Sequence, residues 1–146
     1  MLIEIGQKAK ETSYILGKMG TDLKNAGLLA AAQEILDEED EILKANAADV
    51  AKERGMAPGL VDRLELNHKR IEGIVEGMRQ VVGLEDPVGE VISMKRRPNG
   101  LLIGQKREPF GVIGIIYEAR PNVTADAFAL CFKTGNAVIL RGGSDA

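Results

Sequence analysis

Three polar residues able to bind or stabilise an anion follow an apolar, β-branched run late in the sequence. The run covers residues 111–117, and Glu118, Arg120 and Asn122 come directly after it. The Arg120 guanidinium offers a planar fork to an anion, and the Asn122 amide offers a hydrogen-bond donor. Such groups suit a substrate anion or a developing oxyanion. Alternatively, Arg120 pairs with Glu118, and Asn122 only shapes the turn.

A second polar segment follows the apolar run 137–140. Arg141 adds a fixed charge, Gly142 and Gly143 allow the backbone to approach a ligand closely, and Ser144 adds a hydroxyl. The segment lacks the G-x-G-x-x-G spacing of a dinucleotide-binding fingerprint. Its composition therefore fits either a ligand-binding loop or an ordinary glycine turn.

The residues between the two runs predict a helix that would bring both polar segments together. Thr124 is the expected cap, Asp126 is expected in the first turn, Lys133 lies in the last turn, and Gly135 ends the helix. A helical crossover joins parallel strands, whose carboxyl ends share one edge of the sheet, where ligands of open α/β sheets bind. The first N–H groups of the helix face the same edge and attract anions.

The single cysteine of the chain, Cys131, lies inside this predicted helix. A thiol nucleophile needs exposure and a nearby base or positive dipole, and no histidine is close to Cys131 in the sequence. We therefore expect Cys131 to be a buried packing residue. One cysteine and one histidine also exclude a disulfide framework and a multi-thiolate zinc site within the chain. No metal site is predicted.

The residues before this unit predict helices. Apolar spacing indicates an amphipathic helix over residues 2–19 and one long helix from about 22 to 53. A third helix, which Asn67 caps, runs to about Val82. The acidic run 37–41 is read as a solvated helix face rather than as a site for a metal or a basic partner, because five consecutive residues point around more than one turn. His68, in the first turn of the third helix, is expected at the surface.

Two strand-like runs, 88–95 and 101–108, flank the Asn99-Gly100 pair, which is a strong hairpin signal. Basic side chains decorate this hairpin. They either bind a partner or protect a sheet edge from pairing, which is the commoner use. These side chains are Lys95, Arg96, Arg97, Lys106 and Arg107.

The composition of the 146 residues is that of an ordinary globular domain, with 45% hydrophobic and 28% charged residues. A net charge of −3 and only 3% aromatic residues argue against nucleic-acid binding. Residues 1–86 hold 11 basic and 17 acidic side chains, whereas residues 87–146 hold 8 and 5. The second part suits an anionic ligand, unless the helices are simply rich in glutamate. No apolar run approaches a membrane span and the first residues do not resemble a signal peptide, so a cytoplasmic location is expected.

The segments IYEARPNVT and GNAVILRGGS resemble γ-glutamyl phosphate reductase, also called glutamate-5-semialdehyde dehydrogenase, a branch of the aldehyde dehydrogenase superfamily. The upstream stretch RLELNHKRIEGIVEGMRQVVGLEDPVGEV is similar to the same family, and the resemblance covers essentially the whole chain. The resemblance implies an enzyme of proline biosynthesis. In the family's reaction, NADPH delivers hydride to an acyl-enzyme thioester made from L-glutamyl 5-phosphate. The products are L-glutamate 5-semialdehyde, NADP and phosphate.

The resemblance also implies roles for the polar residues singled out above. Asn122 is the candidate oxyanion donor, and Glu118 and Arg120 are candidates for substrate binding. The superfamily's Pro-Trp-Asn is replaced here by Ala-Arg-Pro-Asn, so the oxyanion position falls on either Arg120 or Asn122. The candidates for NADP binding, including its 2′-phosphate, are Arg141, Gly142, Gly143 and Ser144.

The implied fold is α/β, in the aldehyde-dehydrogenase-like, Rossmann-type pattern. Residues 1–86 would be the N-terminal helical segment of the cofactor-binding domain, 87–108 a hairpin used in oligomerisation, and 109–146 the βαβ start of the NADP-binding core. The expected partners are the substrate L-glutamyl 5-phosphate, further copies in a homo-oligomer and, through a functional link, glutamate 5-kinase. No nucleic acid or membrane is expected as a partner.

Family members are much longer, and their nucleophilic cysteine lies downstream in a separate domain. Cys131 matches a helix position of the family instead. We therefore expect an N-terminal part of the reductase, without the catalytic domain and inactive alone. The alternative is a truncated nucleotide-binding or subunit-interaction module without activity. A different aldehyde dehydrogenase is disfavoured by the Glu-Ala-Arg-Pro-Asn loop.

Overall fold

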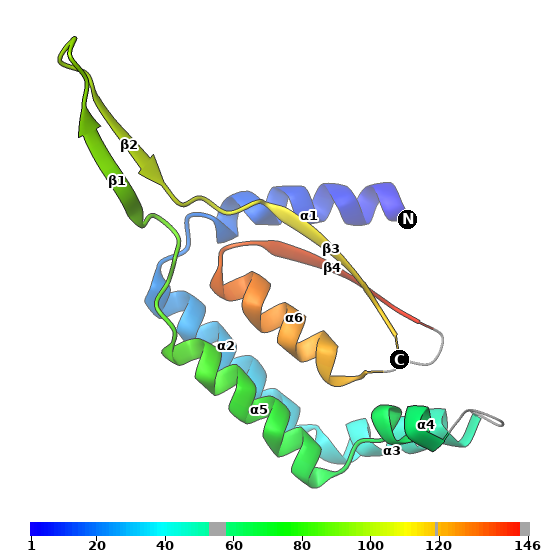
Figure 1. Ribbon diagram of the computed structural model, residues 1–146. Coiled ribbons are helices and arrows are strands. Elements are labelled where there is room, and N and C mark those ends of the chain that lie inside the picture. The colour runs from blue at the N-terminus through cyan, green and yellow to red at the C-terminus, as the bar shows by residue number, and fades with distance from the viewer. Residues whose placement is uncertain (53–57, 119, 144–146) are drawn as a thin grey trace.

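The computed structural model describes residues 1–52, 58–118 and 120–143. Within these ranges the chain forms six helices and four strands (Figure 1). The helices are α1 Leu2–Leu16, α2 Thr21–Asp37, α3 Glu39–Lys52, α4 Pro58–Leu64, α5 His68–Gly83 and α6 Asn122–Lys133. The strands are β1 Val91–Arg96, β2 Leu102–Lys106, β3 Val112–Tyr117 and β4 Ala137–Gly142. The presence of these helices and strands confirms the α/β class that the resemblance implies.

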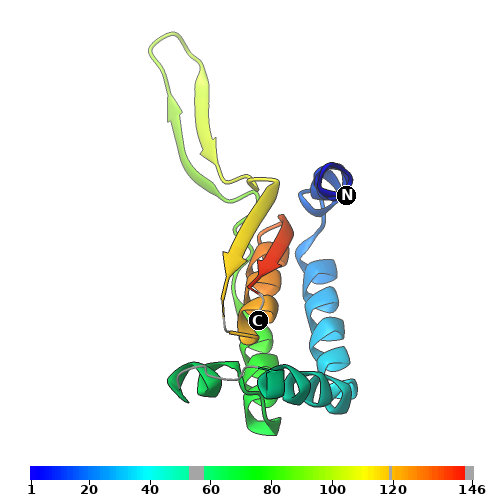
Figure 2. The same cartoon turned by 90° about the vertical axis from the view of Figure 1, so that its right-hand side faces the viewer.

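The elements stack in layers around the β3–β4 pair (Figures 1 and 2). Helix α1 covers one face of this pair and α6 covers the other. Helices α2 and α5 lie side by side and pack against α6 on the side away from the strands. Helices α3 and α4 run across the far end of α2 and α5, and the β1–β2 hairpin projects away from the body.

The predicted strand–helix–strand unit is present, with β3 and β4 parallel and in register from Val112 opposite Ala137 to Tyr117 opposite Gly142. The second strand is two residues longer than predicted. The Asn136 side chain fixes this register, because its Oδ1 accepts the Gly111 N–H at 2.9 Å while its amide donates to Thr134. Gly135 ends α6 as predicted, with a φ of 72° that a side-chain-bearing residue rarely adopts.

The single long helix predicted for residues 22–53 is wrong. The chain leaves helical geometry at Glu38, with φ −100° and ψ 15°, and a new helix begins at Glu39. The acidic run explains the break. Starting a helix at Glu39 places three carboxylates, those of Glu39, Asp40 and Glu41, beside the positive end of a helix dipole, which stabilises them.

Helix α5 begins as predicted, because the Asn67 side chain accepts the Arg70 N–H at 3.0 Å. His68 is exposed, also as predicted, but it connects two helices. Its Nδ1 lies 2.6 Å from Glu39 Oε1, and its Nε2 lies 3.2 Å from Glu72 Oε1. The hydrogen bond to Glu39 is the largest of the effects that raise the pKa of His68 above its ordinary value. His68 therefore connects α3 to α5, and protonation of its imidazole favours this contact.

The hydrophobic core lies where α2, α5 and α6 meet. Its fully enclosed members are Leu28, Ala32, Val75, Met78 and Ala129. Helix α1 contributes less than its apolar spacing predicts, since Leu16 is buried but Leu2 and Ile5 are exposed. Among the described residues, no helix has the length and apolar character needed to cross a membrane.

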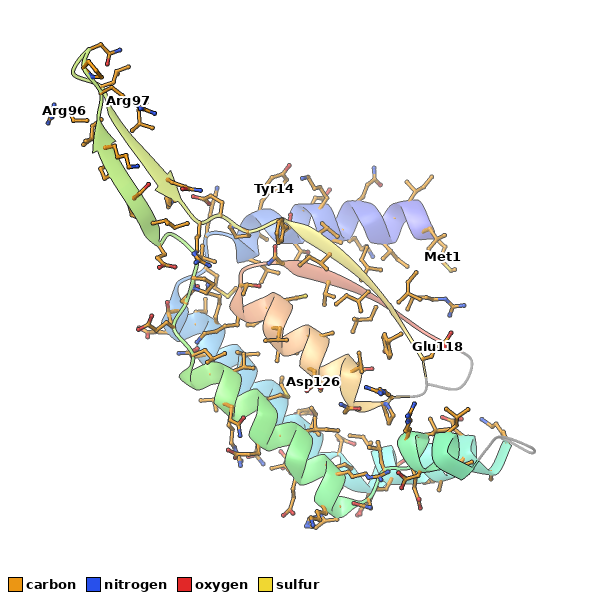
Figure 3. All side chains as sticks on the ribbon, in the orientation of Figure 1. Met1, Tyr14, Arg96, Arg97, Glu118 and Asp126 are labelled. Atoms are coloured by element: carbon orange, nitrogen blue, oxygen red, sulfur yellow. The ribbon has the colours of Figure 1, made fainter. Side chains whose placement is uncertain are left out.

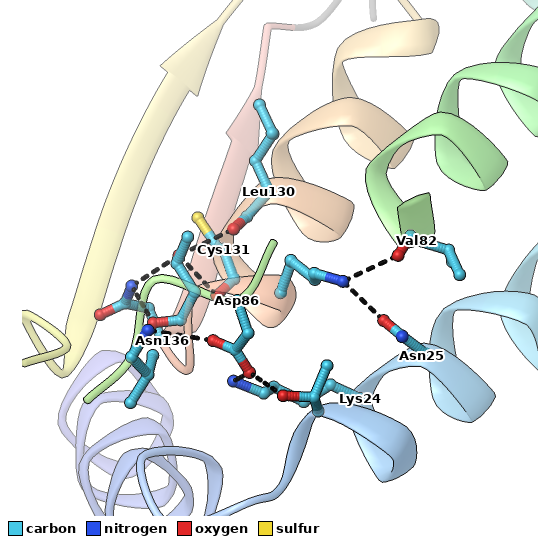
Figure 4. Close-up of polar contacts among 11 residues, drawn as sticks. Lys24, Asn25, Val82, Asp86, Leu130, Cys131 and Asn136 are labelled. Carbon is cyan, nitrogen blue, oxygen red and sulfur yellow. Dashed lines mark hydrogen bonds and ion pairs between the residues drawn. The ribbon is translucent and has the colours of Figure 1, made fainter. Parts of the chain in front are cut away.

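Beside this core lies a buried ionic cluster that the sequence analysis did not predict (Figure 4). The Lys24 side chain of α2 has no exposed surface, and its ammonium forms an ion pair with Asp86. Asp86 also accepts the Thr21 hydroxyl at 2.9 Å and the Val88 N–H at 3.0 Å. Burial opposes the ionisation of Asp86, but the contact with Lys24, followed by the hydrogen bonds from Val88 and Thr21, outweighs it. The pKa of Asp86 therefore lies below its ordinary value.

Lys133, the last residue of α6, is the second buried lysine of this cluster. Its ammonium donates to Asn25 Oδ1 at 2.7 Å and to the Val82 carbonyl at 2.9 Å. Burial lowers the pKa of Lys133, an effect that nearby Lys24 adds to and that Asp86 opposes. The sequence predicts Lys133 in the last turn of a helix, where it does lie. The structure adds that this residue ties α6 to both α2 and α5.

The β1–β2 hairpin is present and antiparallel, with a register irregularity between Val91 and Ser93. Gly100, at φ 89°, makes the predicted turn possible. Both strands are solvent-exposed over nearly their whole length, including large apolar side chains. Two of the basic side chains form ion pairs within the hairpin region: Lys106 pairs with Glu108 at 2.6 Å, and Arg107 pairs with Glu90 at 2.8 Å.

Candidate functional site

The two predicted polar segments meet at one edge of the β3–β4 pair. Tyr117 is opposite Gly142 in the register, and the Gly143 N–H donates to the Tyr117 carbonyl at 2.9 Å. Glu118 lies at the end of β3 (Figure 3). The structure therefore brings together the ends of both strands as the βαβ prediction requires. Ser144 lies outside the described residues.

Helix α6 begins earlier than predicted, at Asn122, and Thr124 is not its cap. The reason is Pro121, whose φ of −61° and ψ of −30° are already helical. The Thr124 hydroxyl instead lies 2.6 Å from the Tyr117 hydroxyl and ties the helix start to the strand end. Asp126 consequently falls beyond the first turn, which contains no acidic residue.

The hydrogen-bond donors at the start of α6 are partly occupied. The Asn122 amide donates to Asp126 Oδ2 at 3.0 Å, so it would have to release this carboxylate before reaching an external oxyanion. The Val123 N–H donates to the Arg120 carbonyl at 3.1 Å. Glu118 and Arg120 are both described and exposed, and no ion pair joins them. The interpretation in which Arg120 only neutralises Glu118 is therefore wrong for this structure.

A pocket of about 440 Å³ opens beside the start of α6 and is bounded on its other side by α4 and the first turns of α5. We call it the α4–α6 pocket. Of the predicted site residues, Arg120 and Asn122 line it, whereas Glu118 and the end of β4 do not. Its lining residues are Asp62, Arg63, Glu65, Leu66, Arg70, Gly73, Ile74, Arg120, Pro121, Asn122 and Asp126.

The α4 wall of this pocket is held in place by two side chains. Arg70 of α5 pairs with Asp62 at 2.8 Å and also donates to the Asp62 and Glu65 carbonyls. The buried Asn46 of α3 donates to the Leu64 carbonyl at 2.8 Å and accepts the Leu66 N–H at 2.7 Å. Pro58 predicts a short helix toward Leu66, which is α4, but the sequence does not indicate that this helix forms a wall of the site. The available signal was Asn46, a polar residue beside the apolar positions of α3.

The end of β4 carries the predicted cofactor-binding residues. Arg141 and Gly142 belong to the strand itself rather than to a loop after it, and Arg141 is opposite Ile116. The Arg141 side chain is exposed, and Gly142 and Gly143 are half-buried. An exposed guanidinium beside an open glycine backbone can receive a phosphate.

Cys131 is 6% exposed and lies in the second half of α6. Burial raises the pKa of its thiol, which keeps the thiol protonated. These features confirm the predicted packing role. Within residues 1–52, 58–118 and 120–143, no three histidine, cysteine, aspartate or glutamate side chains are grouped as metal ligands.

Comparisons by sequence and by fold match this chain to the same group of proteins, the γ-glutamyl phosphate reductases. γ-Glutamyl phosphate reductase of Halothermothrix orenii is 59% identical over 142 residues, which cover 96% of this chain and 34% of the relative. That of Lachnospira eligens is 57% identical over 147 residues, covering 99% and 35%. The chain is related to an N-terminal portion of γ-glutamyl phosphate reductases. It spans about a third of the length of the curated relatives that it matches. No protein-family model matches the chain.

Two solved γ-glutamyl phosphate reductases show that this likeness extends to the backbone. The crystal structure from Thermotoga maritima has a TM-score of 0.94 and 47% identity, covering 99% of this chain and 36% of that one. The enzyme from Saccharomyces cerevisiae has a TM-score of 0.91 and 34% identity, covering 97% and 37%. The family resemblance that the IYEARPNVT and GNAVILRGGS segments suggested is therefore confirmed.

Proposed function

We propose that this chain is the N-terminal part of an NADPH-dependent reductase that converts L-glutamyl 5-phosphate to L-glutamate 5-semialdehyde and phosphate. The observation that carries the proposal is the similarity to γ-glutamyl phosphate reductases, at 59% identity over 96% of the chain. The shared edge of β3 and β4 supports it, because substrate and cofactor groups would meet there. In this proposal, residues 1–86 and 109–146 belong to one Rossmann-type cofactor-binding domain.

For the reaction, we assign anion contacts to the loop before α6. Glu118 and Arg120 bind the substrate, and Arg120 or Asn122 donates to the oxyanion that forms on the substrate carbonyl. The exposure of Arg120 and the absence of an ion pair with the described Glu118 support this assignment. An Asn122 role requires its amide to leave Asp126, which a more negative oxygen would favour.

The residues at the end of β4 fit a phosphate-bearing nicotinamide cofactor. Arg141 offers an exposed charge, and Gly142 and Gly143 leave room for close approach. In this proposal Arg141, Gly142, Gly143 and Ser144 hold NADP, with Arg141 recognising its 2′-phosphate. When bound, NADPH supplies the hydride for the reduction. No metal is part of the proposal.

The chain alone is proposed to lack turnover, because the one cysteine among its 146 residues is buried inside α6. A nucleophile in this reaction must reach the substrate carbonyl, and Cys131 is enclosed by its own helix and its neighbours. The second candidate function is a nucleotide-binding or subunit-interaction module without activity. The exposed Arg141 favours its nucleotide-binding form.

Calorimetry with NADPH and NADH tests the cofactor assignment. We expect Arg141→Ala to weaken NADPH binding by about tenfold or more, the size of a lost charge-assisted contact, and to leave NADH binding nearly unchanged. The matched control is Arg79→Ala, an exposed arginine of α5 outside the sites. Equal loss for both cofactors would contradict the 2′-phosphate role. NADP-dependent oxidation of glutamate semialdehyde that survives Cys131→Ala would contradict the inactivity of the chain.

The β1–β2 hairpin is proposed as an oligomerisation element that meets a second copy of the chain. A two-stranded hairpin is only marginally stable alone, and here it exposes apolar side chains that a partner would cover. About half of the surface of Ile92, Met94 and Ile103 is exposed. A functional link to glutamate 5-kinase and a cytoplasmic location remain predictions from the family.

Replacing one of these apolar side chains with a charge tests the hairpin assignment. We expect Ile103→Lys to shift the chain toward the monomer, because a lysine at the centre of an interface would be buried without a partner. Sedimentation velocity measures the change. Lys95→Gln, at the position paired with Ile103, is the control for altering the hairpin without removing an apolar contact. An unchanged oligomeric state in Ile103→Lys would contradict the assignment.

A further inference from the structure

The α4–α6 pocket carries both signs of charge in close proximity. Three arginines and three acidic residues line it, and they come from separate parts of the chain. Arg70 and Asp62 neutralise each other at 2.8 Å. This pairing removes one charge of each sign and leaves two of each: Arg63 and Arg120, Glu65 and Asp126.

These four remaining groups are available to a ligand. Within the described part of the chain, the side chains of Arg63, Arg120 and Glu65 form no ion pair. Asp126 accepts only the neutral amide of Asn122, so its negative charge is not neutralised. All four side chains belong to exposed residues, which keeps them reachable from solvent.

The pocket wall is also preorganised. A helix of seven residues such as α4 has little stability of its own, yet it is fixed by Arg70 and by the buried Asn46. The opposite wall, the start of α6, is tied to β3 through the Tyr117–Thr124 contact at 2.6 Å. Two walls that are held independently fix the backbone positions from which the charged side chains extend, which lowers the entropic cost of binding.

We propose that the α4–α6 pocket receives the α-amino-acid end of the substrate, with Arg63 and Arg120 facing its carboxylate and Glu65 and Asp126 facing its ammonium group. This proposal rests on the proposed function and adds Arg63 and Glu65 as specificity-determining residues. With Arg120 on the α-carboxylate, it leaves the oxyanion position to Asn122. A zwitterion matches a lining of mixed sign, whereas the two acidic groups would repel a phosphate. Asn122 lies both in the pocket and at the start of α6, so the pocket includes one of the candidate oxyanion donors.

Titration of the isotope-labelled 146-residue chain with L-glutamate, followed by its backbone amide NMR signals, tests the proposal. We expect shifts in α4 and at the start of α6. Glutarate lacks the ammonium group and 4-aminobutyrate lacks the α-carboxylate. Each should therefore bind at least about tenfold more weakly than L-glutamate. Inorganic phosphate is the third comparison.

The variants Arg63→Gln and Glu65→Gln remove one charge each from the pocket. Both are expected to weaken L-glutamate binding by about tenfold, while the exposed Arg79→Gln, on α5 outside the pocket, leaves it unchanged. Two variants are measured so that the proposal can still be tested if one of them fails to fold. Equal binding of glutarate, stronger binding of phosphate, or no response to L-glutamate would overturn the proposal.

NADPH calorimetry on the same samples separates this proposal from the proposed function. NADPH binding without a response to L-glutamate would sink the pocket assignment and leave the reductase assignment standing. L-Glutamate binding that depends on Arg63, without NADPH binding, would support the pocket assignment and count against the cofactor assignment.

Discussion

The Asp86→Asn substitution is expected to destabilise the chain by about 3–5 kcal/mol, because it leaves a buried lysine without its counter-charge. Lys24 has no exposed surface, and Asp86 is its only ionic partner among the described residues. Asparagine preserves the shape of the side chain but has only one oxygen, whereas the Thr21 hydroxyl and the Val88 N–H donate to different oxygens of Asp86. The loss is therefore assigned to the charge and to one hydrogen bond rather than to packing.

Urea denaturation followed by circular dichroism measures this effect. The control is Asp49→Asn, which removes the partner of Lys52 in a solvent-exposed pair and should leave the midpoint nearly unchanged. Replacing Lys24 and Asp86 together with Met and Leu should recover most of the loss, since Lys24 is then removed together with its partner and is not left as an unpaired buried charge. A small effect of Asp86→Asn would show that water reaches Lys24 in solution.

The same cluster determines a pH dependence with a definite sign. The pKa of Asp86 is lower in the folded chain than its ordinary value, so its carboxylate binds fewer protons there than in the unfolded chain. Its stabilising contribution is therefore complete above the unfolded pKa and is lost as the pH falls through the folded pKa. Asp86→Asn should flatten this part of the acid stability profile. Asp49→Asn should not.

The second large effect is expected at Leu28, whose side chain is completely enclosed between α2, α5 and α6. Leu28→Ala should cost about 2.7–5 kcal/mol, because truncation removes buried methyl groups and leaves a cavity that the three helices only partly close. The neighbouring Leu29 provides the control. It is 47% exposed, so Leu29→Ala should cost less than about 1 kcal/mol.

Equilibrium urea unfolding of both variants tests the prediction, provided that the slope with denaturant stays constant. A similar loss at Leu28 and Leu29 would mean that α2 is rotated relative to the arrangement seen here. A small loss at both positions would show that the α2–α5–α6 core does not carry the stability of the chain.

Those parts of the fold that depend on local signals were predictable from the sequence. The βαβ unit follows from two β-branched runs and the Gly135 stop, and the hairpin follows from Asn99-Gly100. The α5 cap follows from Asn67. The errors arose where two local rules compete. Apolar periodicity favoured one helix across Glu38, whereas the acidic run favoured a new helix start.

The candidate site was predictable only in part, because its two sides differ in origin. The strand-end groups Glu118, Arg120 and Asn122 follow from topology, since parallel strands end at the same edge. The α4 wall, with Arg63 and Glu65, depends on how separate helices pack, and no local spacing encodes that. The same holds for the pairing of Lys24 with Asp86, which requires knowledge of the tertiary contacts.

The Lys133–Asn25 hydrogen bond, which joins residues 108 positions apart, has a consequence for the order of events during synthesis. At about 5–20 residues per second, Lys133 is added about 5–20 s after Asn25. Throughout that interval α2 lacks α6, which is one of the two helices that cover its apolar face. The core between α2, α5 and α6 can therefore close only after α6 has left the ribosome.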